Sequence, residues 1–324
     1  MKILIVLMLT FAVLHVKGTE HTLFAQEGQV QIANLYNEED KDTFELIRQQ
    51  FREKNPGYDM GYLSDVREVG AKDITQVAFV QQIGGVTNQD VLAKATITGN
   101  PGSVRESEAI VGDILILHKG ESLRFDTEMG LLIFDVPIEP EQELPSFIRP
   151  DWDPNITDVP GGCATDIDAY RRILLTWSED VGEYIYHALN AHRVRIYDSF
   201  SHYHPIDGGF DEFYLVQMVH PGAKIITSEK VDVIKSPGKV EKSQVDGLID
   251  EHELEVGDLV YLPRGVMHRG YGGVVTQVIT IPGFIPKSEI GVDHHLRAIN
   301  ERLGLSGEDA LPFNEEHSHE PVIR

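Results

Sequence analysis

The chain has 324 residues, of which 41% are hydrophobic and 25% are charged, and its formal net charge is −24 at pH 7. This apolar content suffices for one large or two medium globular domains, and it excludes a chain that is disordered throughout. The acidic balance repels phosphates and anionic lipid headgroups, so we expect neither a nucleic acid nor a membrane surface as partner. A requirement for solubility is enough to explain the negative net charge, and a functional attraction of cations is the alternative explanation.

The first eighteen residues have the pattern of a secretory signal peptide. Lys2 is followed by the apolar run ILIVLMLTFAVLHV, and a small residue, Gly18, ends the segment. This run is too short for a typical transmembrane helix, although an uncleaved anchor remains the alternative reading. We therefore predict a signal peptide at 1–18 and a secreted, extracellular protein.

Two further features bear on a secreted protein. Cys163 is the single cysteine, so no intramolecular disulfide is possible, and we expect a buried thiol, with an intermolecular disulfide as the alternative. Asn155 begins the sequence Asn-Ile-Thr in a stretch rich in Pro, Asp and Gly, which predicts an N-glycosylation site on a surface loop. A homodimer is left open.

The first half of the chain predicts one helix followed by strands. The segment 37–54 has an acidic beginning and apolar residues near helical spacing, which predicts a surface helix. Short apolar runs between Gly, Asn and Pro then predict strands, as in an antiparallel barrel or sandwich. These runs are 77–83, 91–97, 113–119 and 130–136.

A proline-rich interval separates this half from a second set of predicted elements, and we place the linker at 145–166. After it, 168–177 is predicted to be helical, and 289–303 is predicted to be a packed helix that precedes an acidic tail. Between them lie the predicted strands 193–200, 212–219, 224–234, 258–263 and 274–281.

The two halves share a local sequence pattern. Gly112–Arg124 can be laid on Gly257–Arg269 with Gly, Asp and Gly in register, and Leu123 then falls where His268 stands. This predicts a duplicated domain whose first copy, 19–144, lacks metal ligands, and whose second copy, 167–324, keeps them.

The second copy carries a recognisable motif. The spacing Gly257-Asp258-x4-Pro263-x-Gly265-x2-His268 resembles the second conserved motif of the cupin superfamily. The resemblance implies a fold dominated by β-structure: two cupin-type (jelly-roll) β-barrels, or bicupin, with a degenerate N-terminal barrel and a few flanking helices.

The first cupin motif is a strand with His-x-His, and His202-Tyr203-His204 resembles it in residues and position. Side chains two apart on a strand share a face, so both imidazoles can enter the same barrel, and its curvature can bring His268 beside them. The resemblance implies that Glu212 adds a carboxylate. Such a set suits one divalent transition metal ion per chain, namely Mn, Fe, Cu, Ni or Zn, and leaves open positions for water, oxygen or substrate.

The acidic ligand departs from the family spacing. Seven residues separate His204 from Glu212, which is more than the family motif has. Asp207 and Asp211 are therefore alternatives, whereas Glu212 begins an apolar strand as the family's glutamate does, after a Gly-Gly pair that accommodates a longer hairpin loop.

Two functions follow from the resemblance. Similar two-barrel proteins include oxalate-degrading enzymes and flavonol dioxygenases. An oxalate decarboxylase would carry ligands in both barrels, so a chain with one occupied barrel looks more like an oxygenase, an oxidase or a metal-dependent isomerase. Together with the signal peptide, this resemblance implies a secreted metalloenzyme, of oxygenase or oxidase type, acting on a small oxygen-bearing organic substrate. The alternative is a non-enzymatic, acidic matrix or storage protein that keeps its metal site. The remaining pairs His294-His295 and His317-x-His319 are expected to be surface residues, with accessory metal binding as the alternative.

Overall fold

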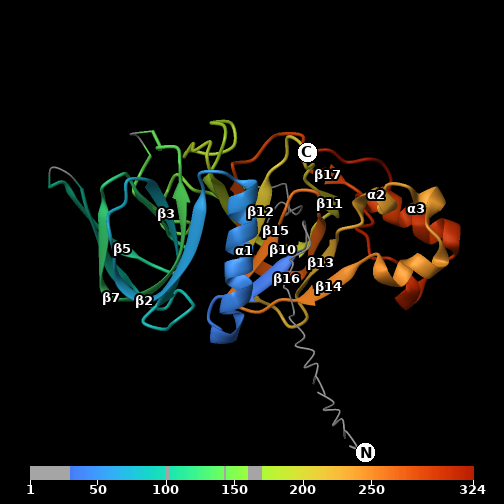
Figure 1. Ribbon diagram of the computed structural model, residues 1–324, viewed down its shortest axis with the longest axis horizontal. Coiled ribbons are helices and arrows are strands. Elements are labelled where there is room, and N and C mark those ends of the chain that lie inside the picture. The colour runs from blue at the N-terminus through green and yellow to red at the C-terminus, as the bar shows by residue number, and fades with distance from the viewer. Residues whose placement is uncertain (1–29, 100–101, 142–143, 160–169) are drawn as a thin grey trace, which may run out of the picture.

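The chain folds into two β-sheets that lie side by side with one long helix, α1, between them (Figure 1). The computed structural model describes residues 30–99, 102–141, 144–159 and 170–324. The predicted signal peptide, Cys163 and the last part of the predicted linker, 160–166, lie outside these residues. The expectation of a fold dominated by β-structure is confirmed.

The N-terminal sheet has seven strands, in the order β5-β4-β7-β3-β6-β8, and β2 pairs with the outer side of β7. Its strands are β2 (Asp59–Val69), β3 (Thr75–Ile83), β4 (Ala93–Thr98), β5 (Val104–Ala109), β6 (Ile114–Leu117), β7 (Ser122–Val136) and β8 (Phe147–Ile148).

The C-terminal sheet has ten strands and curls into a nearly closed barrel. They are β1 (Gln31–Asn34), β9 (Arg171–Leu175), β10 (Asn190–Asp198), β11 (His202–Tyr203), β12 (Asp211–Val219), β13 (Lys224–Ser228), β14 (Asp250–Glu253), β15 (Asp258–Leu262), β16 (Met267–Ile281) and β17 (Ile290–Gly291). Although β1 precedes every strand of the N-terminal sheet, it pairs with β15. Within the described residues, the chain therefore passes from the C-terminal sheet through α1 into the N-terminal sheet.

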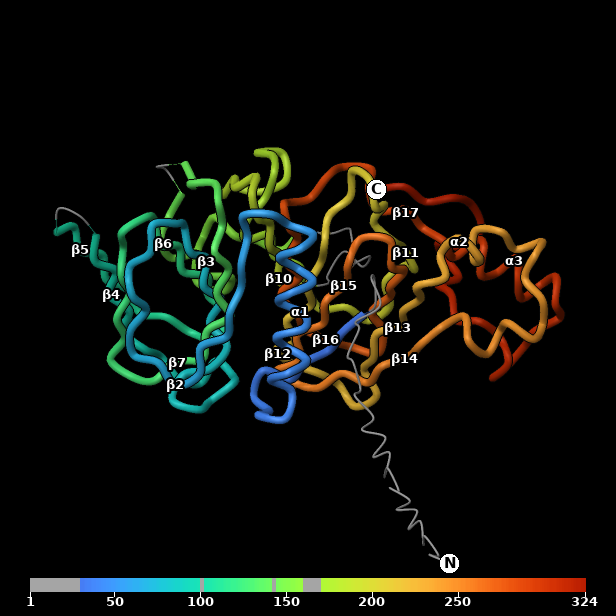
Figure 2. Tube along the Cα trace, in the orientation of Figure 1, coloured from blue at the N-terminus to red at the C-terminus, as the bar shows by residue number. Residues whose placement is uncertain are grey.

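The described part of the chain has few helices. The predicted helices at 37–54 and 289–303 are confirmed as α1 (Lys41–Lys54) and α3 (Asp293–Leu303). A short α2 (Val231–Ile234) lies near α3 at the end of the molecule away from the N-terminal sheet (Figure 2). The 3₁₀ turns are η1 (Glu38–Asp40), η2 (Pro237–Lys239), η3 (Lys242–Gly247) and η4 (Gly307–Asp309).

Two predicted elements are wrong. The segment 168–177 was expected to be helical, yet its described part forms strand β9, which pairs with β10 and buries Ile173, Leu174 and Leu175 in succession. Tertiary pairing overrides the weak helical preference of this run. The strand expected over 224–234 ends at Ser228, whose hydroxyl donates to the Leu248 carbonyl at 2.7 Å and accepts from the Lys230 amide at 3.0 Å, and the chain then turns into α2.

An apolar core joins the two sheets. Phe51 from α1, Phe134 from β7 and Phe213 from β12 meet with ring centroids 5.4–5.8 Å apart, at angles typical of edge-to-face packing. All three are fully buried, so α1, predicted as a surface helix, covers the junction of the sheets with its apolar face.

The sheets repeat each other's strand lengths and pairings. β7 and β16 both have 15 residues, β3 and β12 both have 9, and each of the two shorter strands carries a register shift six residues from its start. Gly112 and Gly257 both have positive φ, at 101° and 98°. The following Asp113 and Asp258 each accept a backbone N–H from three residues earlier. The Gly-Asp turn, on which the sequence alignment of the two halves rests, therefore has the same backbone conformation and the same hydrogen bond in both sheets.

Candidate metal centre

Strand pairing brings the predicted histidines together. β11 is only two residues long, and its first residue, His202, lies directly opposite His268, the second residue of β16. His204 follows two residues later and contributes its ring to the same group. Its carbonyl accepts the Gly265 amide at 2.7 Å, which ties this segment to the Pro-x-Gly turn before β16.

The three imidazoles converge on one point. Their ring centroids lie 4.3 Å apart for His202 and His268, 5.1 Å for His204 and His268, and 5.4 Å for His202 and His204. One nitrogen from each lies within 4.8 Å of the others, so the group could hold a metal ion. Nδ1 of His202 lies 3.1 Å from the Phe200 carbonyl, and Nδ1 of His268 lies 3.4 Å from that of Val266. These contacts assign the proton to Nδ1 and leave Nε2 as the donor atom.

Glu212 faces the same point from β12. Its Oε1 lies 3.3 Å from Nε2 of His268, and its Oε2 lies 3.7 Å from Nε2 of His204. Alternation along the strand explains this placement, because Glu212, Tyr214 and Val216 point to the inside of the sheet while Phe213 points to the core between the sheets.

The two alternative carboxylates lie elsewhere. Asp207 is exposed in the loop before β12. Asp211 is fully buried, but its carboxylate accepts both the backbone N–H and Nε–H of Arg264, at 3.0 Å each, and also bonds from Asn55 and Tyr261. It ties the end of α1 to the turn after β15, and the structure brings Glu212 alone of the three beside the histidines.

Burial controls the charge of the group. Desolvation lowers the pKa of His202 and of His268 to about 4, and that of His204 well below its usual range. Desolvation likewise raises the pKa of Glu212 to about 7, against the opposing effect of His202. The imidazoles are therefore neutral near pH 7, which is the form that binds metals.

The donor atoms lack protein partners. Nε2 of all three histidines and Oε1 of Glu212 are buried without a hydrogen bond. Each such atom costs about 1–3 kcal/mol relative to a satisfied one. Four orphaned donors at one point, three imidazole nitrogens and one carboxylate oxygen, fit a divalent transition metal ion.

A second carboxylate, Glu289, was missed by the sequence analysis. Its Oε1 lies 3.9 Å from Nε2 of His202, and the residue is 9% exposed. Burial raises its pKa above the usual range. It arrives through β17, whose Gly291 and Ile290 pair with His202 and Tyr203. No local motif marks it, because only this long-range pairing places it.

Aromatic rings cover the group. Phe200 stacks on His202 with centroids 4.4 Å apart, and Phe210 lies 3.9 Å from the ring of His204. Phe284 packs on Phe210, and Trp177 stacks on Phe284. Trp177 is partly exposed, so this row of rings runs from the histidines to the surface. The donor atoms therefore lie in an apolar shell.

The N-terminal sheet has other residues at the equivalent positions. Val69 pairs with Leu123 as His202 pairs with His268, so these two apolar residues replace two histidines. Ala71, two residues on, replaces His204 by the same count. Gln76 pairs with Leu117 and Asp135 as Glu212 pairs with Leu262 and Thr280, so an amide replaces the carboxylate. Within the described residues, the His202, His204 and His268 cluster is the one group of at least three His, Cys, Asp or Glu that could hold a metal ion.

The remaining predicted residues have simple positions. Asn155 is exposed, and its glycosylation stays a prediction. His294, His295 and His319 are partly or fully exposed, as expected. His317 was expected at the surface, but it is 9% exposed, because its ring stacks on Phe200 with centroids 5.5 Å apart.

The fold and the site define a mainly β protein with one buried centre of three histidines and a carboxylate. No family model matches the chain, and no curated protein matches it. No helix among the described residues is long and apolar enough to cross a membrane.

Solved structures of oxalate decarboxylases are similar in arrangement. One from Bacillus subtilis, studied for its Mn(II) centres, is 11% identical with a TM-score of 0.46, and the match covers 92% of this chain and 85% of that one. One from Lactobacillus farciminis, in complex with formate, is 16% identical with a TM-score of 0.42, and the match covers 81% and 85%. At these values the likeness carries no weight for activity, substrate or site residues.

Proposed function

We propose that the chain is a two-barrel cupin and a metalloenzyme of oxygenase or oxidase type, with one divalent transition metal ion in the C-terminal barrel. The observation that carries this proposal is the convergence of four buried, unpartnered donor atoms from His202, His204, His268 and Glu212. In this reading the N-terminal barrel, within 19–144, has lost its ligands, the linker is 145–166, and 167–324 carries the site.

The metal, when bound, would supply Lewis acidity and open coordination positions for a small oxygen-bearing organic substrate or for dioxygen. The protein's own part is to keep the imidazoles neutral through burial, and to hold those of His202 and His268 in one tautomer through the carbonyls of Phe200 and Val266. Glu289 lies next to these donors with a raised pKa, so its carboxyl group can hold a proton and exchange it beside the substrate. The rings of Phe200 and Phe210 exclude water.

Metal analysis tests the site. Protein purified without added metal is measured by mass spectrometry for bound Mn, Fe, Cu, Ni and Zn, beside the variants His268→Ala and His319→Ala. We expect about one equivalent in the wild type and in His319→Ala, whose ring is exposed, and little in His268→Ala. Stoichiometric metal in His268→Ala would show that the proposed site is wrong.

Turnover separates the enzyme from the alternative. Oxygen consumption and loss of oxalate, a flavonol and a keto acid are followed with the metal-loaded protein. Turnover that His268→Ala abolishes supports the enzyme. The full burial of the donors favours the second candidate, a non-enzymatic matrix or storage protein, and stoichiometric metal with no turnover and no spectral change on adding substrates would support it.

We further propose that the protein is secreted, on the pattern of residues 1–18, and carries a glycan at the exposed Asn155. A small molecule is its expected partner, and a nucleic acid or a membrane surface is not, because the net charge is −24. A homodimer stays open.

A further inference from the structure

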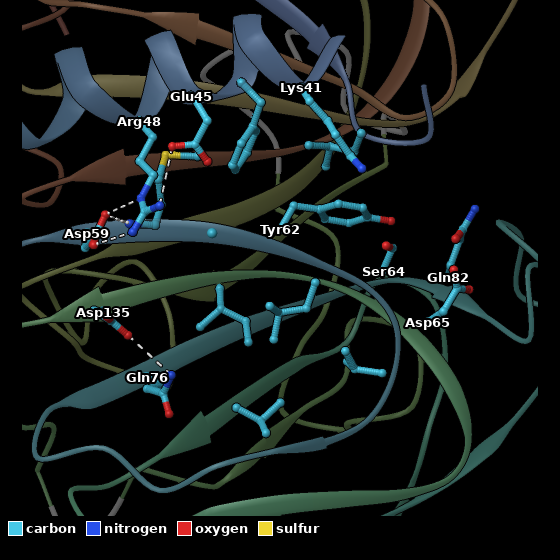
Figure 3. Close-up of a pocket in the computed structure, with 18 of the residues that line it drawn as sticks. Lys41, Glu45, Arg48, Asp59, Tyr62, Ser64, Asp65, Gln76, Gln82 and Asp135 are labelled. Carbon is cyan, nitrogen blue, oxygen red and sulfur yellow. Dashed lines mark hydrogen bonds and ion pairs between the residues drawn. The ribbon is translucent and has the colours of Figure 1, made fainter. Parts of the chain in front are cut away.

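The structure contains a cavity whose lining residues are remote in sequence from the histidine cluster. It has a volume of about 890 Å³ and lies between α1 and the outer strand β2 (Figure 3). Lys41, Glu45 and Arg48 of α1 form one wall, and Tyr62 of β2 lies opposite them. Its volume is within the roughly 300–1,000 Å³ of sites for small organic ligands.

The inner wall of this cavity is formed by the positions that hold the donors in the C-terminal sheet. Val69, Ala71 and Gln76 line it, and these residues are the equivalents of His202, His204 and Glu212. Val69 and Ala71 have smaller side chains than the histidines His202 and His204 at the equivalent positions of the other sheet. The N-terminal sheet has therefore exchanged a compact cluster of metal donors for a wider cavity.

Two polar atoms of the lining residues are buried without a partner. Gln76 is 2% exposed, and its Nε2 donates to Asp135 at 3.3 Å, while its Oε1 has no hydrogen bond. The Tyr62 hydroxyl is likewise buried and unpartnered. Both residues line the cavity, but neither orphaned atom has exposed surface in it, so a ligand would be held by the other polar groups of the lining.

The charges of the lining exclude an anion. Its three cations are already paired, Arg48 with Asp59 at 2.8 Å, Lys72 with Asp135 at 2.8 Å, and Lys41 with Glu38. The lining carboxylates outnumber the cations, since they are Glu38, Asp40, Glu45, Asp59, Asp65, Glu68 and Asp135. Carboxylate and amide oxygens accept hydrogen bonds, so the cavity favours a ligand rich in donors such as hydroxyl groups.

The same lining also offers aromatic faces. Tyr36 and Tyr62 lie with ring centroids 6.4 Å apart, and Phe44 and Met60 add apolar surface. A polyhydroxylated ring combines hydroxyl groups at its rim with C–H surface on its faces, and so it matches both kinds of lining. We propose that this cavity is a metal-independent binding site for a neutral mono- or disaccharide.

A substitution at Gly61 can fill the cavity without disturbing the residues around it. It lies on β2 in the lining, and a Cβ built there meets no atom within 4 Å. Gly61→Phe therefore fills the cavity in a strand, where an aromatic residue is well tolerated. Gly238→Phe is the matched control, because Gly238 also has open space around it but is exposed in η2, outside this cavity.

The test uses the full chain, stripped of metal, and saturation-transfer NMR with glucose, mannose, galactose, cellobiose and maltose at about 10 mM each. We expect at least one of these sugars to bind. Its Kd should rise about tenfold or more in Gly61→Phe and stay unchanged in Gly238→Phe. Glu45→Ala removes an exposed carboxylate of the lining, so it serves if Gly61→Phe does not fold, and it should raise Kd about fivefold.

Three outcomes would overturn the proposal: no sugar of the panel binds, binding survives in both cavity variants, or only charged analogues such as glucosamine or glucuronate bind. Because the protein is metal-free in this test, the result does not depend on the proposed metalloenzyme.

Discussion

Metal affinity at the three-histidine centre should change with pH in a way that ordinary histidine and glutamate side chains would not produce. Binding requires neutral imidazoles and an ionised carboxylate. Burial places the pKa of His202 and His268 at about 4, and that of Glu212 at about 7. Between about pH 5 and pH 7 the imidazoles are thus already neutral, and Glu212 alone must lose a proton when the metal binds.

The number of protons released on metal binding determines how steeply metal affinity changes with pH. One proton released per metal means that the association constant rises tenfold per pH unit, or about 100-fold from pH 5 to pH 7, and levels off above pH 7. With unperturbed values, about 6.5 for histidine and 4.3 for glutamate, three imidazoles would release protons instead, and the slope below pH 6.5 would approach three. The two cases differ by orders of magnitude at pH 5.

The association constant is measured with Co²⁺, whose visible absorbance is followed in competition with a chelator. Calorimetry in two buffers of different ionisation enthalpy gives the number of protons released per metal ion. Glu212→Gln should abolish the proton release and reduce affinity at pH 7 beyond the roughly 10–100-fold that outer-sphere changes cause. Asp207→Asn is the control and should bind as the wild type does, because Asp207 is exposed. A slope near three, or loss of the proton release in Asp207→Asn, would refute the reasoning.

Three stability predictions follow from buried groups. Arg264→Met leaves the fully buried Asp211 carboxylate without its charged partner, and urea unfolding should show a loss of about 3–5 kcal/mol, against less than about 1 kcal/mol for Arg124→Met at an exposed pair. Phe51→Ala should cost about 3–5 kcal/mol, because the ring fills the core between the sheets, and a cost below about 1 kcal/mol would contradict that packing. Gly257→Ala should lower the thermal midpoint, since its φ is 98° and the new methyl group would clash with an aromatic ring of the N-terminal segment, and an unchanged midpoint would contradict the turn geometry.

Local sequence patterns predicted the parts of the site that local geometry determines. The Gly-Asp turn before β15 and the His-x-His pair on β11 each depend on a few consecutive residues, so spacing alone identified them. The choice of Glu212 over Asp211 also follows a local rule, because adjacent residues of a strand point to opposite faces. In the structure one of the two faces the histidines and the other faces Arg264.

The remaining parts depend on pairings between distant segments. β1 joins β15 across more than 200 residues, β9 is a strand because β10 lies beside it, and Glu289 reaches His202 only through the pairing of β17 with β11. None of these segments has a strong pattern of its own. Each is short or of mixed composition, so its conformation and position are decided by the partner strand.

The contrast between the two sheets gives the strongest physical reason to expect a ligand at the histidine centre. Both sheets keep the same turn and the same pairings, so the frame does not need the histidines. In the N-terminal sheet, Val69 and Leu123 fill their positions with buried apolar groups, which cost nothing in unmet hydrogen bonds, and among the equivalent residues only Gln76 leaves one buried atom, Oε1, without a partner. The C-terminal sheet instead keeps four unpartnered donor atoms, at about 1–3 kcal/mol each. The N-terminal sheet shows that the same fold forms with apolar side chains at the positions of the histidines, which lowers stability less. The retained donors therefore have a use that outweighs their cost to stability, and binding a metal ion is the use that satisfies all four at once.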